Sequence, residues 1–318
     1  MKAYGDENIW IAQRADPYVY RHTDGMYYFT ASLPEYQGIA IRKSGHLRDL
    51  ATAEEVMIWK KHEEGPMGAH IWAPELHYLE GRWYIYFAAG NAEKKWHIRP
   101  YVLECTGQDP VKDAWVERGR LQGADDDEFS FGDFSLDATI FQHNEKNYCI
   151  WAEKVGVGMQ ISNLYLAEME TPVKMKTAQV LLSTPDYDWE RRGFWVNEGP
   201  AVIKHAGRIF VTYSASDTGS NYCMGMLSVA ENENILDPEK WSKKRYPVLQ
   251  TEEPRGLYGP GHNSFTVDEQ GEPVLVCHCR TSKEIEGNPL YNPNRHAMLW
   301  KIKWNEQGEP VFAYDPLD

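Results

Sequence analysis

The sequence has no cluster of basic residues, and acidic side chains outnumber basic ones. Its 33 lysines and arginines stand against 47 aspartates and glutamates, which gives a formal net charge of −14. A surface with this charge repels phosphate backbones, so we expect no nucleic-acid partner. The sequence also lacks an apolar run long enough to cross a bilayer, so we expect no membrane association.

The N-terminus and the cysteines bear on the cellular compartment. The first residues, MKAYGDEN, do not form the apolar segment of a secretory signal. The five cysteines are an odd number. Cys277 and Cys279 would share one face of a strand, but a zinc site needs further ligands at a suitable spacing. We therefore expect buried, reduced cysteines and predict a cytoplasmic protein.

Helical periodicity is also scarce, whereas paired strand patterns recur along the whole chain. In the first, Asp16–Tyr20 leads through Asp24 and Gly25 into Met26–Thr30. Four similar units follow, and the leading polar residues of the five units are Asp16, Glu75, Asp137, Glu198 and His262. Their spacings are 59, 62, 61 and 64 residues, and each unit leaves room for two more strands. This period predicts an all-β, five-bladed propeller with four antiparallel strands per blade, formed as one domain over residues 1–318.

The first strand of each blade in a propeller lines the central axis, so the five leading residues should gather at one mouth of the channel. Crowded, desolvated carboxylates raise one another's pKa and cost stability, which favours a functional interpretation. Three uses are open: binding a metal ion, acid–base catalysis, or a polar lining for a neutral ligand. Two carboxylates on either side of a glycosidic bond are typical of glycosidases.

The motifs around these residues resemble those of glycoside hydrolase family 43, whose members are five-bladed propellers. Three acidic motifs carry the resemblance: ADPYVY with Asp16, SLDATIF with Asp137, and NEGPAVI with Glu198. HIWAPELHY at His70–Tyr78 resembles the second-blade motif of the family, and GPGHNSF at Gly259–Phe265 resembles its fifth-blade motif. The five motifs occur in order, and the resemblance covers nearly the whole chain, from about residue 10 to residue 304.

The resemblance implies catalytic roles for the three acidic residues. Asp16 would be the general base, Glu198 the general acid, and Asp137 the residue that orients the acid and modulates its pKa. The family inverts the anomeric configuration, so Asp16 would activate a water molecule on the face opposite the leaving group.

Other residues are expected to bind the sugar or an ion. By the same resemblance, Trp72 forms the aromatic wall of the −1 sugar pocket and Arg280 hydrogen-bonds a sugar hydroxyl. His262 matches a family histidine near a calcium ion or a water cluster in the channel, so the resemblance implies a Ca²⁺ site there, with His262 contacting the ion through water. The register places Glu75 in the −1 pocket. Phe134 and Trp195, with Trp96 and Phe194, follow or precede motif strands, where they could stack on sugars.

The residues of the first two motifs are most similar to those of small arabinofuranosidases. The expected substrate is therefore a neutral pentose oligosaccharide, with release of terminal α-L-arabinofuranose from 1,5-linked arabino-oligosaccharides. A β-xylosidase of the same family and a non-catalytic sugar-binding propeller stay open. The invertase and fructosidase group fits poorly, because its Asn-Asp-Pro-Asn-Gly, Arg-Asp-Pro and Glu-Cys motifs are replaced here.

Overall fold

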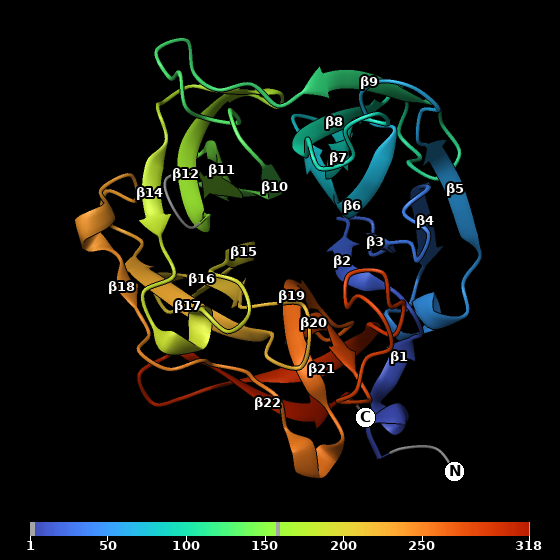
Figure 1. Cartoon of the computed structure of the whole chain (residues 1–318), viewed down its shortest axis with the longest axis vertical. Coiled ribbons are helices and arrows are strands. Elements are labelled where there is room, and N and C mark those ends of the chain that lie inside the picture. Colours follow the sequence, from blue (N-terminus) through green and yellow to red (C-terminus); the bar gives the residue numbers. More distant parts are fainter. Residues whose placement is uncertain (1–3, 157–159, 318) are drawn as a thin grey trace.

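The computed structural model describes residues 4–156 and 160–317, and its strands form five antiparallel sheets around one axis (Figure 1). This confirms the predicted five-bladed β-propeller. The inner strands β2, β6, β10, β15 and β19 lie nearest the centre in Figure 1.

The sheets take up the chain in order, one blade after another. The first is β2 (Ala15–Arg21), β3 (Tyr27–Ser32), β4 (Gly38–Ser44) and β5 (Glu55–Lys60); the second is β6 (Ala69–Leu79), β7 (Arg82–Gly90), β8 (Arg99–Cys105) and β9 (Trp115–Arg120). The third is β10 (Ser135–His143), β11 (Lys146–Val155), β12 (Ile161–Thr171), β13 (Lys174–Met175) and β14 (Val180–Ser183). The fourth is β15 (Asn197–His205), β16 (Arg208–Ala215), β17 (Cys223–Ala230) and β18 (Ser242–Lys243). The fifth is β19 (Tyr258–Val267), β20 (Pro273–Arg280), β21 (His296–Trp304) and β22 (Pro310–Pro316), with β1 (Ile9–Ile11) added from the start of the chain.

The pairing of β1 with β21 closes the ring of blades. Ile9 lies opposite Met298 and Ile11 opposite Ala297, so the fifth sheet joins both ends of the chain. The helices are short 3-10 turns: η1 (Tyr4–Asn8), η2 (Arg48–Ala51), η3 (Asp188–Glu190), η4 (Pro238–Lys240) and η5 (Glu253–Arg255). In the part of the chain described, no helix has the length and apolar character needed to span a membrane.

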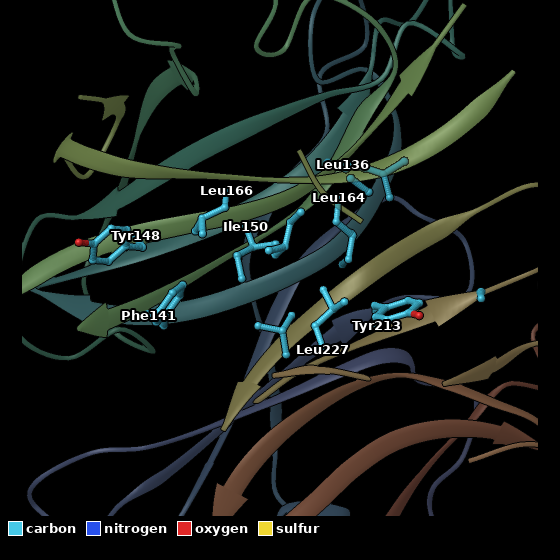
Figure 2. Close-up of a cluster of buried hydrophobic side chains, with 14 of the residues drawn as sticks. Leu136, Phe141, Tyr148, Ile150, Leu164, Leu166, Tyr213 and Leu227 are labelled. Carbon is cyan, nitrogen blue, oxygen red and sulfur yellow. The ribbon is translucent and has the colours of Figure 1, made fainter. Parts of the chain in front are cut away.

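The hydrophobic core lies between neighbouring blades. Figure 2 shows one such cluster, in which Leu136, Phe141, Tyr148, Ile150, Leu164 and Leu166 of the third blade approach Tyr213 and Leu227 of the fourth. All five cysteines are buried and free, as expected. A core of this size stabilises the domain without disulfides.

Each inner strand breaks its pairing register at the same place with a β-bulge. The bulge residues have left-handed φ angles and are Asp16 (52°), Ala73 (46°), Asp137 (56°), Gly199 (54°) and His262 (43°). A bulge bends the strand and re-aims a side chain, and bulges of this kind are common beside active sites. The predicted alignment is therefore shifted in two blades: Glu198 precedes its bulge by one residue, and Glu75 follows its bulge by two.

Candidate active site

A cavity of about 620 Å³ opens where the inner strands begin, and all three predicted catalytic carboxylates line it. Asp16 is 8% exposed and Asp137 is 5% exposed, whereas Glu198 is less deeply buried. The inner strands β2, β10 and β15 thus bring together side chains that are far apart in the sequence. Convergence of the three carboxylates was predicted from the repeat.

Asp16 is surrounded by cationic and hydrogen-bonding partners. The Ser32 hydroxyl donates to Asp16 Oδ2 at 2.5 Å. Asp16 Oδ1 lies 3.3 Å from His262 Nδ1 and 3.5 Å from Arg295 Nη1. Burial alone would raise the pKa of Asp16, but His262 and Arg295 outweigh burial and lower it below its usual range. Asp16 is therefore held in its ionised form.

Asp137 and Glu198 have fewer cationic partners, and their pKa values move the other way. The Gly199 N–H donates to Asp137 Oδ2 at 2.9 Å, and the Tyr222 hydroxyl donates to Glu198 Oε1 at 2.7 Å. Burial, together with the nearby carboxylates, raises the pKa of Asp137 to about 8 despite the influence of His262. Burial also raises the pKa of Glu198. A raised pKa keeps a carboxyl group protonated nearer to neutral pH.

His262 lies between the carboxylates, with Nδ1 3.3 Å from Asp16 Oδ1 and 3.9 Å from Asp137 Oδ2. Burial lowers its pKa, but the surrounding carboxylates outweigh burial and raise it. Within residues 4–156 and 160–317, no three side chains of His, Cys, Asp or Glu are grouped to hold a metal ion. Calcium binding through water at His262 therefore stays a prediction.

Aromatic side chains form much of the cavity wall. The predicted sugar-binding residues Trp72, Phe134 and Trp195 all line it, as do Trp96 and Phe194. Trp72 is 8% exposed and stacks on His70 with ring centroids 4.4 Å apart. Trp96 and Phe194 are 50% and 66% exposed at the rim. These faces could take up the apolar faces of sugar rings.

Two predicted sugar-binding residues lie outside the cavity lining. Glu75 is buried, and its Oε2 lies 2.9 Å from His77 Nε2. Arg280 is 2% exposed and donates to Pro289 O at 2.7 Å and to Asn292 Oδ1 at 2.9 Å. The guanidinium of Arg280 therefore supports the loop between β20 and β21, and the arginine at the cavity is Arg295.

Sequence reasoning missed several residues of the site: Ser32, Lys154, Tyr222, His278 and Arg295. Only His278 carried a usable signal. It lies between Cys277 and Cys279, and strand alternation directs its side chain opposite to the two thiols. The others become neighbours of the carboxylates only when the blades close into a ring.

Comparison with known proteins gives a consistent result. The family model described as glycosyl hydrolases family 43 matches residues 7–310. The chain is 46% identical over 312 residues to the extracellular exo-α-(1→5)-L-arabinofuranosidase of Streptomyces avermitilis, which covers 98% of this chain and 64% of that protein. It is 49% identical over 284 residues to the enzyme of the same name from Streptomyces chartreusis, covering 89% and 85% of the two chains. The chain thus spans less than two thirds of the Streptomyces avermitilis protein.

Among solved structures, the chain is similar to the crystal structure of the α-L-arabinofuranosidase from Lactobacillus brevis. The two share 48% sequence identity with a TM-score of 0.90, over 98% of each chain.

These relatives contradict the predicted cytoplasmic localisation. Both Streptomyces proteins are named extracellular enzymes, which points to secretion. The prediction rested on polar first residues and unpaired cysteines. Neither decides the compartment here, because the five thiols are buried and a core of this size does not depend on disulfides.

Proposed function

The chain belongs to glycosyl hydrolases family 43, and we propose that it is an inverting, exo-acting α-L-arabinofuranosidase. Its substrate would be a neutral arabino-oligosaccharide with α-(1→5) linkages, from which it releases terminal arabinofuranose. The names of the relatives that are 46% and 49% identical support this substrate.

In the proposed reaction Asp16 acts as general base and Glu198 as general acid. Asp16 removes a proton from water, and the water oxygen attacks the anomeric carbon as the glycosidic bond breaks. Glu198 gives its proton to the departing oxygen. The products are arabinose with inverted configuration and an alcohol, the shortened oligosaccharide.

The opposite pKa shifts of the two carboxyl groups are the observation that carries this proposal. Cationic neighbours lower the pKa of Asp16, and burial raises the pKa of Glu198. At one pH the first is ionised and ready to accept a proton, while the second retains a proton to donate. Two carboxyl groups whose pKa values are shifted in opposite directions are typical of an acid–base pair.

Asp137 is proposed to orient Glu198 and to set its protonation. Its Oδ2 accepts the N–H of Gly199, the residue that follows Glu198, at 2.9 Å. This bond fixes the backbone next to the acid. Charge on both carboxyl groups at once is disfavoured, so the ionisation of one favours the protonated form of the other.

The loop between β20 and β21 supports exo action. Lys283, Ile285 and Asn288–Leu290 line the cavity from this loop. Tyr36 of the first blade donates to Leu290 O and accepts from Arg295 Nη2, while Arg280 donates to Pro289 O. The loop is thus fastened to the first and fifth blades as one wall of the cavity, and a wall at one end favours binding of a chain terminus.

The test is incubation with linear α-(1→5)-arabinotriose and, separately, xylobiose, with products followed by chromatography. Release of single arabinose units by the wild type, but not by Glu198→Gln, is expected. An NMR spectrum of the first product should show the β anomer. Xylose release instead would overturn the substrate, and tight binding without any release would favour a sugar-binding propeller.

A further inference from the structure

His278 is a buried histidine beside Asp16 that the hydrolytic steps above do not use. It lies on β20 of the fifth blade, whereas Asp16 lies on β2 of the first. His278 is 1% exposed, so the ring does not reach the substrate. Any role in the reaction must act through the residues that it contacts.

The backbone N–H of Asp16 defines the protonation state of the His278 ring. This N–H donates to His278 Nδ1 at 3.1 Å. Nδ1 also lies 3.4 Å from Asp16 Oδ1, but its shorter contact is the one to the N–H. Because a backbone N–H can only donate, we assign the lone pair to Nδ1 and the ring proton to Nε2. Burial lowers the pKa of His278 to about 3, which agrees with a neutral ring. Nε2 is buried without a hydrogen-bond partner among residues 4–156 and 160–317. The ring is therefore held by its contact at Nδ1.

The same contact recurs in other blades, where serine makes it. Ser32 accepts the N–H of Ala73 at 2.8 Å, and Ser214 accepts the N–H of His262 at 2.6 Å. In each case a side chain from the second strand of one blade bonds the bulge N–H of the next. His278 makes this contact from the last blade to the first. It satisfies the backbone of a non-glycine residue held at a φ of 52°, a conformation that costs free energy.

Histidine can do what serine cannot, because its ring stacks on Tyr222. The two rings are 5.5 Å apart between centroids and nearly parallel, at 4°. The Tyr222 hydroxyl donates to Glu198 Oε1 at 2.7 Å. One side chain therefore contacts the backbone of Asp16 and the residue that holds Glu198.

We propose that His278 is a positioning residue that holds Asp16 through Nδ1 and Glu198 through Tyr222, and so sets the two catalytic groups relative to each other. This inference rests on the proposed acid and base roles.

The test separates the two contacts with two substitutions. In His278→Phe the aromatic ring remains but the acceptor for the Asp16 N–H is lost. In His278→Asn the amide oxygen can accept that N–H, but the stack on Tyr222 is lost. With arabinotriose we expect kcat of His278→Phe to fall about 10- to 100-fold with KM little changed, since small displacements of reacting groups have effects of this size. We expect His278→Asn to recover part of that loss.

His143→Phe is the matched control. His143 is also a buried histidine on a propeller strand, 5% exposed, but it lies at the turn end of β10, away from the cavity. It should keep the wild-type kcat. If kcat of folded His278→Phe stays within about twofold of the wild type, His278 is not a positioning residue.

A second measurement does not depend on variants that fold. A ¹⁵N NMR spectrum of the wild-type imidazoles at pH 7 should show His278 with an unprotonated Nδ1 and a protonated Nε2. A proton on Nδ1 would overturn the inference. Failure of the wild type to cleave arabinotriose would refute the proposed function instead, and the NMR result would still report on the contact.

Discussion

Asp16 and Glu198 come from the inner strands of the first and fourth blades, yet their surroundings differ. Oδ1 of Asp16 lies within 3.5 Å of His262, His278 and Arg295 nitrogens. Glu198 accepts a hydrogen bond from the neutral Tyr222 hydroxyl. Burial pushes both pKa values upward, so the charges of His262 and Arg295 beside Asp16 are what reverse the direction there. In this fold the neighbouring blades, more than depth, decide which carboxyl group is ionised.

The largest effect on activity should come from replacing either of these two carboxyl groups. Asp16→Asn should lower kcat by about 10²- to 10⁴-fold on arabinotriose and equally on 4-nitrophenyl α-L-arabinofuranoside, because both reactions need an activated water. Glu198→Gln should lower kcat by a similar factor on arabinotriose. It should lower kcat far less on the nitrophenyl substrate, because that leaving group departs without a proton. Initial rates on both substrates check this. Equal losses for Glu198→Gln on the two would contradict its role as acid.

The third carboxyl group gives an effect on stability as well as activity. The folded-state pKa of Asp137 is raised to about 8, above the ordinary value of about 3.9 for an unfolded chain. Its contribution to stability is therefore complete below about pH 4 and is lost as the pH rises toward 8. An asparagine side chain cannot ionise, so the variant Asp137→Asn does not lose stability in this way. At pH 9 it should be more stable than the wild type by about 1.4 kcal/mol or more.

Thermal unfolding of Asp137→Asn and the wild type at pH 4 and pH 9, with a chelator present, measures this difference. The two proteins should agree at pH 4, and kcat of the variant should be reduced at every pH. A variant that is less stable than the wild type at pH 9 would show that the Asp137 charge is compensated in the folded protein.

Ser32 links Asp16 to the second blade. Its hydroxyl donates to Asp16 Oδ2 and accepts the N–H of Ala73. Ser32→Ala leaves the buried N–H without this partner, which should lower the free energy of unfolding by about 1–3 kcal/mol. Denaturant titration tests this, with the exposed Ser242→Ala as control, which should change stability by less than about 0.5 kcal/mol. Equal effects at the two serines would argue against the inter-blade contact.

The smallest expected effect is a shift in the pH profile when Lys154, near Glu198, is replaced. Lys154 lines the cavity with its Nζ 4.0 Å from the centre of the Phe134 ring, and its charge lowers the pKa of Glu198. Lys154→Met keeps the packing but removes the charge, so the pKa of Glu198 should rise. The alkaline limb of the pH profile of kcat should then move up by about half a pH unit. A limb that stays in place or moves down would show that Lys154 has no electrostatic role.

The repeat of about sixty residues is what made the fold predictable. Strand length, turn residues and blade period are local properties, and each unit buries its apolar faces only against its neighbours. Asp16, Asp137 and Glu198 could be recognised for the same reason, since each recurs with the repeat near the start of an inner strand. Trp72 was likewise found from its motif and lines the cavity.

Contacts between blades do not follow from the repeat and form only when the chain folds. The bulges shift the register, so Glu75 lies beyond its bulge and beside His77, outside the cavity lining. Arg280 turns to loop carbonyls, and Arg295, which the repeat did not mark, reaches Asp16 instead. Periodicity along the chain is enough to predict the blades and their carboxylates. Which carboxylate is charged depends on partners up to 279 residues away, and ring closure alone brings those together.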